Sequence, residues 1–264
     1  MIKGDVFMFL VFNKDKICAY GISIITVILL FCAASVMITD NADIILTGAS
    51  AGKLLPVYKV DTKEKKIALT LNCAWNDSDI DSILQTLKNN DCKVTFFMVG
   101  DWVKKYPEAA KKIKEAGHEI GTHSNTHPHV NNLDYEKNAS ELRESAKIIK
   151  ETTGADIKLY RTPYGEYNDT VIKVANESGY IPIQWSLDTL DYTKLTGEQM
   201  WDRLKNKLTS GDIILMHNGT EHTADSLDMI IKNIKNTGFD VVRVSDIIYT
   251  ENYTIDVNGV QKKN

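Results

Sequence analysis

The feature that most constrains the fold is a regular alternation of strand-like and helix-like segments from residue 65 to residue 250. Short apolar runs alternate with segments whose apolar residues recur every three or four positions. Repeated β–α units of this kind form a parallel sheet with helices outside it. Seven β–α steps in about 190 residues favour a (β/α) barrel of seven or eight units, complete or incomplete, over an open sheet. The pattern alone does not separate a closed barrel from an open sheet.

The boundaries of the expected elements follow from the same pattern. The predicted strands are residues 65–71, 93–100, 118–123, 157–163, 180–187, 211–217 and 240–244. The predicted helices are residues 79–90, 107–117, 134–154, 168–179, 196–211 and 224–238, with a short helical end at 245–250. Residues 55–60 are expected to form a hairpin with the first of these strands. The longest helix should end at Gly154, since glycine commonly terminates helices.

An uncharged stretch, Ile17–Thr39, precedes the alternating region. Its 23 residues are enough to cross a bilayer as a helix. Lys14 and Lys16 come before it and Asp40 follows it, and positive charge favours the cytoplasmic side. We therefore expect a single transmembrane anchor in the cell membrane, with the remaining chain outside the cytoplasm. The alternatives are a cleaved signal peptide and a buried core helix.

These features divide the chain into five parts. They are a cytoplasmic tail at 1–16, the anchor at 17–39, a linker at 40–52, the α/β domain at 53–250 and a C-terminal tail at 251–264. The net charge is −4, so the chain has no basic excess and a nucleic-acid partner is not expected. We expect a monomer attached to the membrane through its N-terminal helix.

The two cysteines of the α/β domain are not expected to form a disulfide. Cys73 ends the first long strand and Cys92 begins the next parallel strand, so they belong at opposite ends of the sheet. Six residues of strand separate such positions by roughly 20 Å. A disulfide requires Cα atoms within about 7 Å.

Polar side chains follow five of the predicted strands at their C-terminal ends, which in a barrel form one rim. They are Asn72, Cys73, His123, His127, Arg161, Asp188, Asp191 and His217. Five strands that deliver such residues to one rim are hard to explain by solubility alone. The sequence therefore predicts an active site there.

Each of these groups has a chemical interpretation. His123 and His127 could share one metal if the chain turns between them, which Pro128 favours over a helix; otherwise they are surface histidines. Arg161 can orient a carboxylate or an amide, or form an ordinary surface ion pair. His217 reads as a proton donor or as a buried core histidine.

The pair of carboxylates between these motifs is less specific. Either Asp188 or Asp191 could brace a histidine, and both could instead cap the helix that follows them.

Together these motifs resemble the polysaccharide deacetylase family, the NodB-homology domain of carbohydrate esterase family 4, over about residues 53–250. "HSNTH" at 123–127, "RTPYG" at 161–165 and "LMH" at 215–217 match closely. "DTLDY" at 188–192 has Tyr192 where the family usually has tryptophan. The first motif diverges, because the family pattern Thr-Phe-Asp-Asp-Gly is here Thr70-Leu71-Asn72-Cys73-Ala74.

The resemblance implies a deformed barrel, a divalent metal that is often zinc, and hydrolysis of N-acetyl groups on peptidoglycan or chitin-like sugars. It implies that His123 and His127 hold the metal, that His217 is the general acid tuned by Asp191, and that Arg161 orients the base. Substrate contacts would come from Tyr164, Leu215, Tyr192 and Trp75, with the backbone near Tyr164 helping to hold the oxyanion.

The divergent motif falls on two family roles. The first aspartate of the pattern is the base, and Asn72 cannot accept a proton. The second is a metal ligand, and Cys73 is a chemically sound replacement as a thiolate. Asp77 and Asp79 lie just beyond and could take either role.

Two functions remain open from the sequence. One is a membrane-anchored, metal-dependent polysaccharide N-deacetylase of the cell envelope, a hydrolase of non-peptide carbon–nitrogen bonds. The other is a catalytically silent glycan-binding or structural module that keeps the fold. Hydrolysis of an O-acetyl ester is a third possibility, because it needs less help for the leaving group.

Overall fold

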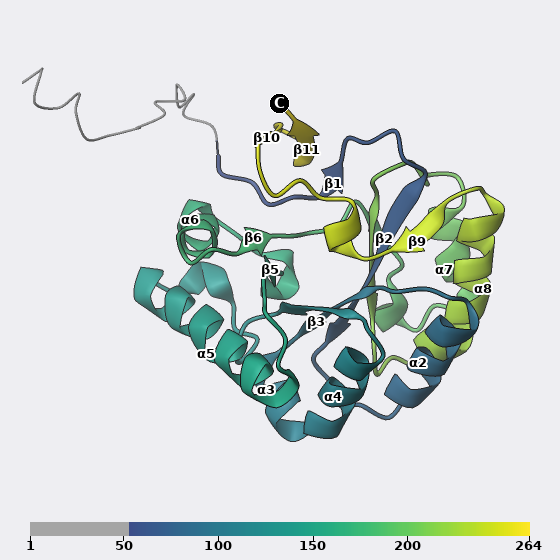
Figure 1. Cartoon of the computed structure of the whole chain (residues 1–264), viewed down its shortest axis with the longest axis horizontal. Helices are drawn as coiled ribbons and strands as arrows, with labels where there is room; N and C mark the ends of the chain where they lie inside the picture. The colour runs from purple at the N-terminus through teal and green to yellow at the C-terminus, as the bar shows by residue number, and fades with distance from the viewer. Residues whose placement is uncertain (1–52) are drawn as a thin grey trace, which may run out of the picture. The chain divides into compact units, whose positions relative to one another are not determined.

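A curled parallel sheet runs through the part of the chain that the computed structural model describes, residues 53–264 (Figure 1). Its strands are ordered β6-β5-β4-β3-β2-β8-β7, and β9 pairs with the first half of β2. The strands are β2 (Lys66–Cys73), β3 (Thr95–Met98), β4 (Glu119–Thr122), β5 (Leu159–Tyr160), β6 (Ile181–Pro182), β7 (Leu187–Asp188), β8 (Ile213–His217) and β9 (Asp240–Val242). The predicted α/β class with a parallel sheet is confirmed.

The two edge strands of this sheet come from one segment. The single strand expected at 180–187 is divided into β6, which pairs with β5, and β7, which pairs with β8. Between them the backbone of Ser186 already bonds the carbonyl of Ile213. The barrel is therefore deformed: β6 and β7 are joined by the chain rather than by hydrogen bonds.

The helices pack on the outside of the curled sheet (Figure 1). Their order around the sheet nearly follows the order of the strands that they cover. They are α2 (Ile80–Asn89), α3 (Gly100–Lys105), α4 (Pro107–Glu115), α5 (Tyr135–Thr153), α6 (Asp169–Glu177), α7 (Gly197–Leu204) and α8 (Thr223–Asn236). Short 3-10 turns lie at η1 (Val130–Asn132), η2 (Pro163–Gly165), η3 (Asp191–Thr193) and η4 (Val244–Asp246). As predicted, α5 ends at Gly154, whose φ of 68° is left-handed.

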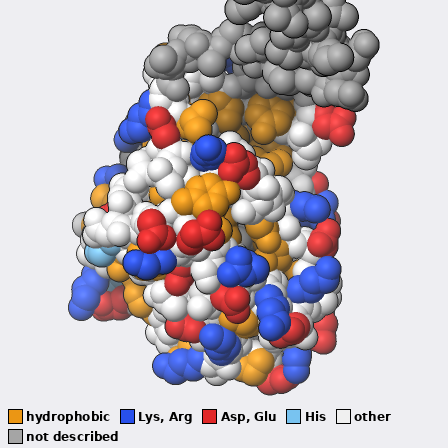
Figure 2. All heavy atoms as spheres, turned by 90° about the vertical axis from the view of Figure 1, so that its left-hand side faces the viewer, with side chains coloured by type: hydrophobic (Ala, Val, Ile, Leu, Met, Phe, Trp, Pro, Cys, Tyr) orange, Lys and Arg blue, Asp and Glu red, His pale blue; other side chains and the backbone are white. Residues whose placement is uncertain are grey.

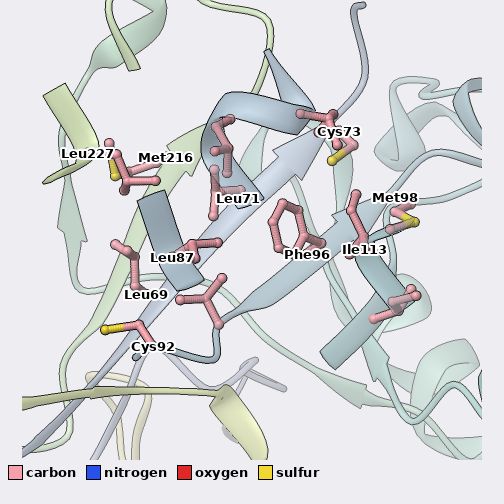
Figure 3. Close-up of a cluster of buried hydrophobic side chains, with 14 of the residues drawn as sticks. Leu69, Leu71, Cys73, Leu87, Cys92, Phe96, Met98, Ile113, Met216 and Leu227 are labelled. Atoms are coloured by element: carbon pink, nitrogen blue, oxygen red, sulfur yellow. The ribbon is translucent and has the colours of Figure 1, made fainter. Parts of the chain in front are cut away.

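The central strand β2 has two different faces because side chains alternate along a strand. Leu69, Leu71 and Cys73 point toward the helices, in the largest cluster of buried apolar side chains (Figure 3). Thr70 and Asn72 point the other way, toward the inside of the curled sheet, where both contact Arg161. This alternation decides which residues of the divergent motif can reach a site.

The expected hairpin before β2 is absent from the described residues. β1 (Lys59–Val60) pairs instead with β11 (Val260–Lys263), which also pairs with β10 (Tyr253–Ile255). The segment expected to be a C-terminal tail thus forms two strands of a small second sheet. The prediction failed because the paired residues of β1 and β11 are 201 positions apart in the sequence, where no local pattern points to the pairing.

Within residues 53–264 no helix is both long and apolar enough to cross a membrane. The anchor expected at 17–39 and the linker at 40–52 lie outside the described residues. On the face shown in Figure 2, Lys and Arg side chains are interspersed with Asp and Glu. Cys73 and Cys92 are free and buried at separate places in the core, as predicted (Figure 3).

Candidate active site

A cavity of about 470 Å³ opens at the C-terminal ends of the parallel strands. Its walls are Asn72, Ala74, Trp75, His123, His127, Thr162, Tyr164, Gly165, Trp185, Asp188, Tyr192, Leu215 and His217. Nine of the residues singled out from the sequence are among them. Arg161 lies behind Asn72 and Asp191 behind His217. Cys73 is separate from this group.

Arg161 is fully buried behind the cavity wall. Its Nη1 donates to Asn72 Oδ1 at 3.0 Å and to Thr70 Oγ1 at 2.8 Å, and its Nη2 donates to the carbonyl of Gln184. Its Nε has no partner, and among the described residues no carboxylate forms an ion pair with the guanidinium. Burial lowers the pKa of Arg161 to about 9, so the side chain remains charged at neutral pH.

An aromatic surface supports this cation. The guanidinium lies over the ring of Phe97 at 4.1 Å from the centroid, and 5.6 Å from the ring of Trp185. Phe97 can occupy this place because residue 121 is glycine: a Cβ there would lie 2.6 Å from the Phe97 ring. Gly121 therefore makes room for the ring that carries Arg161.

His123 presents one nitrogen to the cavity. Its Nδ1 lies 2.8 Å from the carbonyl oxygen of Arg161. A carbonyl can only accept, so Nδ1 carries the hydrogen and Nε2 has a free lone pair. Burial lowers the pKa of His123 well below its ordinary range, and the neighbouring His127 adds to this effect. A neutral imidazole of this kind is suited to bind a metal.

His127 follows through a turn, as Pro128 predicted. Its φ of 58° is left-handed, and its backbone N–H donates to Ser124 Oγ. Glu141 on α5 fixes the turn, because its carboxylate accepts from the backbone of Asn125 and Thr126, both at 2.8 Å. The rings of His123 and His127 are 4.9 Å apart, and burial also lowers the pKa of His127. Glu141 was missed from the sequence because it looks like any exposed helical carboxylate.

His217 is held by Asp191, which resolves the choice between the two aspartates. Asp191 Oδ1 accepts from His217 Nδ1 at 2.8 Å, and its Oδ2 accepts from the His217 backbone and from Thr223 Oγ1. The rings of Trp75 and Tyr192 each lie 5.3 Å from the His217 ring. Asp188 instead lines the cavity, where burial raises its pKa.

Cys73 does not face this site, which corrects the prediction that it is the third metal ligand. Its side chain has no exposed area and lies in the core with Leu71 and Met98 (Figure 3). Burial raises the pKa of the thiol well above its ordinary range, whereas metal binding requires a thiolate. The spacing in sequence was misleading because adjacent residues of a strand point to opposite faces.

The two nearby aspartates do not fill the gap. The carboxylate of Asp79 accepts from the backbone of Gly219 at 2.7 Å and from Asn218 Nδ2 at 3.2 Å, so it ties the loop after β2 to the loop after β8. Neither Asp77 nor Asp79 lines the cavity. Asp79 therefore has a structural position, and neither aspartate supplies a base or a metal ligand to the cavity.

The side chains present do not fit a zinc centre with three protein ligands. His123 and His127 supply two imidazoles, but among residues 53–264 no group of three histidine, cysteine or acidic side chains is close enough to hold one ion. A catalytic zinc site ordinarily has three such ligands. The two sides of the site therefore differ. His217 and Asp191 form a hydrogen-bonded pair on one side, whereas His123 and His127 on the metal-binding side have no third protein ligand among the described residues.

Known proteins share this fold and motif order. The family model for polysaccharide deacetylases matches residues 59–183. BA3943 of Bacillus anthracis, a pseudoenzyme of carbohydrate esterase family 4, is 32% identical with a TM-score of 0.71, over 73% of this chain and 68% of that one. The chain belongs to the polysaccharide deacetylase family. A BA3943 mutant with restored enzymatic activity gives the same identity and TM-score.

Other members of the family include peptidoglycan deacetylases. The peptidoglycan N-acetylglucosamine deacetylase PgdA of Listeria monocytogenes is 33% identical over 198 residues, 75% of this chain and 42% of PgdA. The Bacillus subtilis protein YlxY, whose function is not described, is 33% identical over 73% of this chain and 60% of YlxY. The chain therefore matches only part of the length of both relatives.

Proposed function

We propose that the described domain is a glycan-binding module of the bacterial cell envelope that keeps the deacetylase fold but does not hydrolyse its ligand. The observation that carries the proposal is the pairing of buried Arg161 with an amide, Asn72, where a base would need a carboxylate. Asn72 accepts the hydrogen bond but cannot take a proton from water. Cys73, at the position of the family's metal ligand, is buried on the opposite face of β2.

The ligand we propose is an N-acetylated amino-sugar polymer such as peptidoglycan. The cavity is rich in aromatic side chains, and Trp75, Tyr164 and Tyr192 are each about half exposed at its edge. Aromatic faces suit sugar rings, which present a face of apolar C–H bonds. Apolar walls with a few fixed polar groups, as here, are typical of small-ligand sites.

Deacetylation is the second candidate function, and the intact His217–Asp191 pair favours it. Asp191 fixes the imidazole so that Nε2 of His217 faces the cavity, where it could protonate a departing amine. A metal held by His123 and His127 would polarise the acetyl carbonyl. A deacetylase that works without the base and the third ligand would be slow.

The deciding experiment measures binding and acetate release together. We expect the soluble domain to bind insoluble peptidoglycan, and to release no acetate from N-acetylated or O-acetylated glycans with or without added zinc. Acetate release by the parent protein that is lost in His217→Ala would instead establish the deacetylase. Absence of glycan binding in the parent protein would contradict both candidates for this polymer.

The substitution Asn72→Asp separates the two candidates further. It is nearly isosteric and restores a proton acceptor beside Arg161. If the cavity lacks only its base, acetate release should rise by up to about 10²–10⁴-fold. Under our proposal, Asn72→Asp alone stays inactive because the third ligand is still missing, while glycan binding persists.

We also propose that residues 17–39 anchor the protein in the cell membrane with the domain outside the cytoplasm. The uncharged stretch and the lysines before it support this orientation. Protease added to cells stripped of their wall should digest the domain. Protection until lysis would contradict the orientation, and a mature protein that begins after residue 39 would indicate a cleaved signal instead.

A further inference from the structure

Beside the cavity lies an exposed surface of which the proposed function uses only Tyr164. The ring of Tyr164 stacks on the ring of His129, with centroids 4.3 Å apart and planes within 11°. His129 Nδ1 donates to Glu166 Oε1 at 2.7 Å. His129 and Glu166 do not line the cavity, but Tyr164 does. The three side chains therefore extend the cavity wall outward.

The backbone of this surface is strained at Tyr164. Tyr164 has φ 56° and ψ 6°, a left-handed conformation that is uncommon for a side chain of its size. Strain of this kind persists only where the surroundings impose it, and it gathers at binding and catalytic sites. Here the stack on His129 and an edge-on contact with the His127 ring, 4.6 Å away, fix the ring. The ring of Tyr164 is thus placed in advance of any ligand.

Exposure distinguishes this stack from ordinary packing. Tyr164 is 57% exposed, and the side chains of His129 and Glu166 are 57% and 30% exposed. Flat rings accept the apolar C–H face of a sugar, and a neighbouring carboxylate accepts hydrogen bonds from hydroxyl groups. These are the two kinds of contact that a single hexose unit offers.

We propose that Tyr164, His129 and Glu166 form an outer subsite for the sugar unit next to the one held in the cavity. This inference rests on the proposed glycan-binding function and deepens it, because it requires a polymer rather than a single sugar. Trp75 and Tyr192 beside His217 are further exposed aromatic side chains at the edge of the cavity. The ligand is therefore a chain of at least two hexose units.

The test compares ligand lengths. The affinities of the N-acetylglucosamine monomer and tetramer are measured by calorimetry for the parent protein and for His129→Ala. The aromatic contact should contribute roughly three- to tenfold in affinity. We expect His129→Ala to weaken the tetramer by this factor and to leave the monomer unchanged. His129→Phe, which keeps a flat ring on Tyr164, should retain most of the tetramer affinity.

Tyr135→Ala is the matched control, because Tyr135 on α5 also pairs an exposed ring with a glutamate, Glu177, but does not line the cavity. It should bind both ligands as the parent does. Equal tetramer affinity in His129→Ala and the parent would overturn the subsite and leave the proposed function standing. An equal loss for monomer and tetramer would also overturn it, since His129 would then act through the cavity. If the parent binds neither ligand, both proposals fail.

Discussion

On one side of the cavity His217 is backed by the carboxylate of Asp191, while on the other side Arg161 is backed by the amide of Asn72. Asp191 accepts three hydrogen bonds, two from His217 and one from Thr223. Arg161 donates three but keeps its charge without a carboxylate partner and leaves its Nε unpaired. The first side pairs an imidazole with a carboxylate, whereas the second pairs a buried cation with an uncharged amide.

The comparison shows that an uncharged acceptor can keep the same hydrogen-bond geometry without supplying a base. An amide oxygen accepts a hydrogen bond from an arginine as a carboxylate oxygen does, so Asn72 keeps the contact with Arg161 at the cavity wall. The amide differs from a carboxylate because it carries no negative charge and has a much lower affinity for a proton. A buried cation without a counter-charge is expensive, and the lowered pKa of Arg161 expresses that cost.

The largest effect is expected from restoring the charge. Breaking a buried ion pair by removing one partner costs about 3–5 kcal/mol. Arg161 is already buried without such a partner, so Asn72→Asp should raise the free energy of unfolding by about 3 kcal/mol at pH 7. Urea denaturation measures it. In the control Asn72→Ala, which removes the acceptor, stability should fall. A loss of stability in Asn72→Asp would mean that burial of the new carboxylate outweighs the pairing.

The pH dependence of the free energy of unfolding tests the same side of the cavity through His123. The pKa of buried His123 lies well below its ordinary value of 6.5, so below that pH the unfolded chain binds a proton that the folded protein does not. His123 alone should therefore lower the free energy of unfolding by up to about 1.4 kcal/mol for each pH unit below its ordinary pKa. The slope should be smaller in His123→Gln. His127 and His118 add to the slope in the same direction, because burial lowers the pKa of both, that of His118 to about 4. An unchanged slope would show that His123 is charged in the fold.

On the side of His217 and Asp191, a smaller effect is expected from Thr223→Val. Its hydroxyl donates to Asp191 at 2.7 Å, and a hydrogen bond to a charged group is worth about 1.5–3 kcal/mol. Since Asp191 keeps two donors from His217, we expect a loss of about 1.5 kcal/mol in thermal or urea unfolding. Thr189→Val is matched, because its buried hydroxyl donates to the neutral carbonyl of Leu215. If both variants lose the same free energy of unfolding, the charge of Asp191 does not strengthen the hydrogen bond from Thr223.

Much of this arrangement could be predicted from the sequence because it depends on local periodicity. Apolar spacing located the parallel strands and outer helices, and the rule that parallel strands end at one edge gathered His123, Asn72 and His217. The partner of β1 could not be predicted, since it is distant in the chain. Nor could the division of 180–187 into two edge strands, because no glycine or charged residue marks a break within this segment.

The error at Cys73 has a different cause. Residue type and motif position both suggested a ligand, and only the direction of the side chain excludes it. That direction follows from β2 continuing as a regular strand to its last residue, so that Asn72 and Cys73 face opposite ways. A strand that ended one residue earlier would have left the second position free to turn toward the cavity. The sequence does not specify that boundary.

The smallest effect is expected for metal binding in Cys73→Ser. A serine hydroxyl is a much poorer zinc ligand than a thiolate, so a true ligand would show a large loss of affinity. Because the thiol lies in the core, we expect Cys73→Ser to bind zinc as the parent does in a competition titration, while His127→Ala binds it more weakly. The hydroxyl should still cost about 1–3 kcal/mol in urea unfolding, since the core offers it little hydrogen bonding. Cys73→Ala separates this polar cost from the loss of volume. Weaker zinc binding in Cys73→Ser but not in more distant core variants would show that the end of β2 rearranges around the metal. Cys73 would then complete the metal-binding side of the cavity as a third ligand.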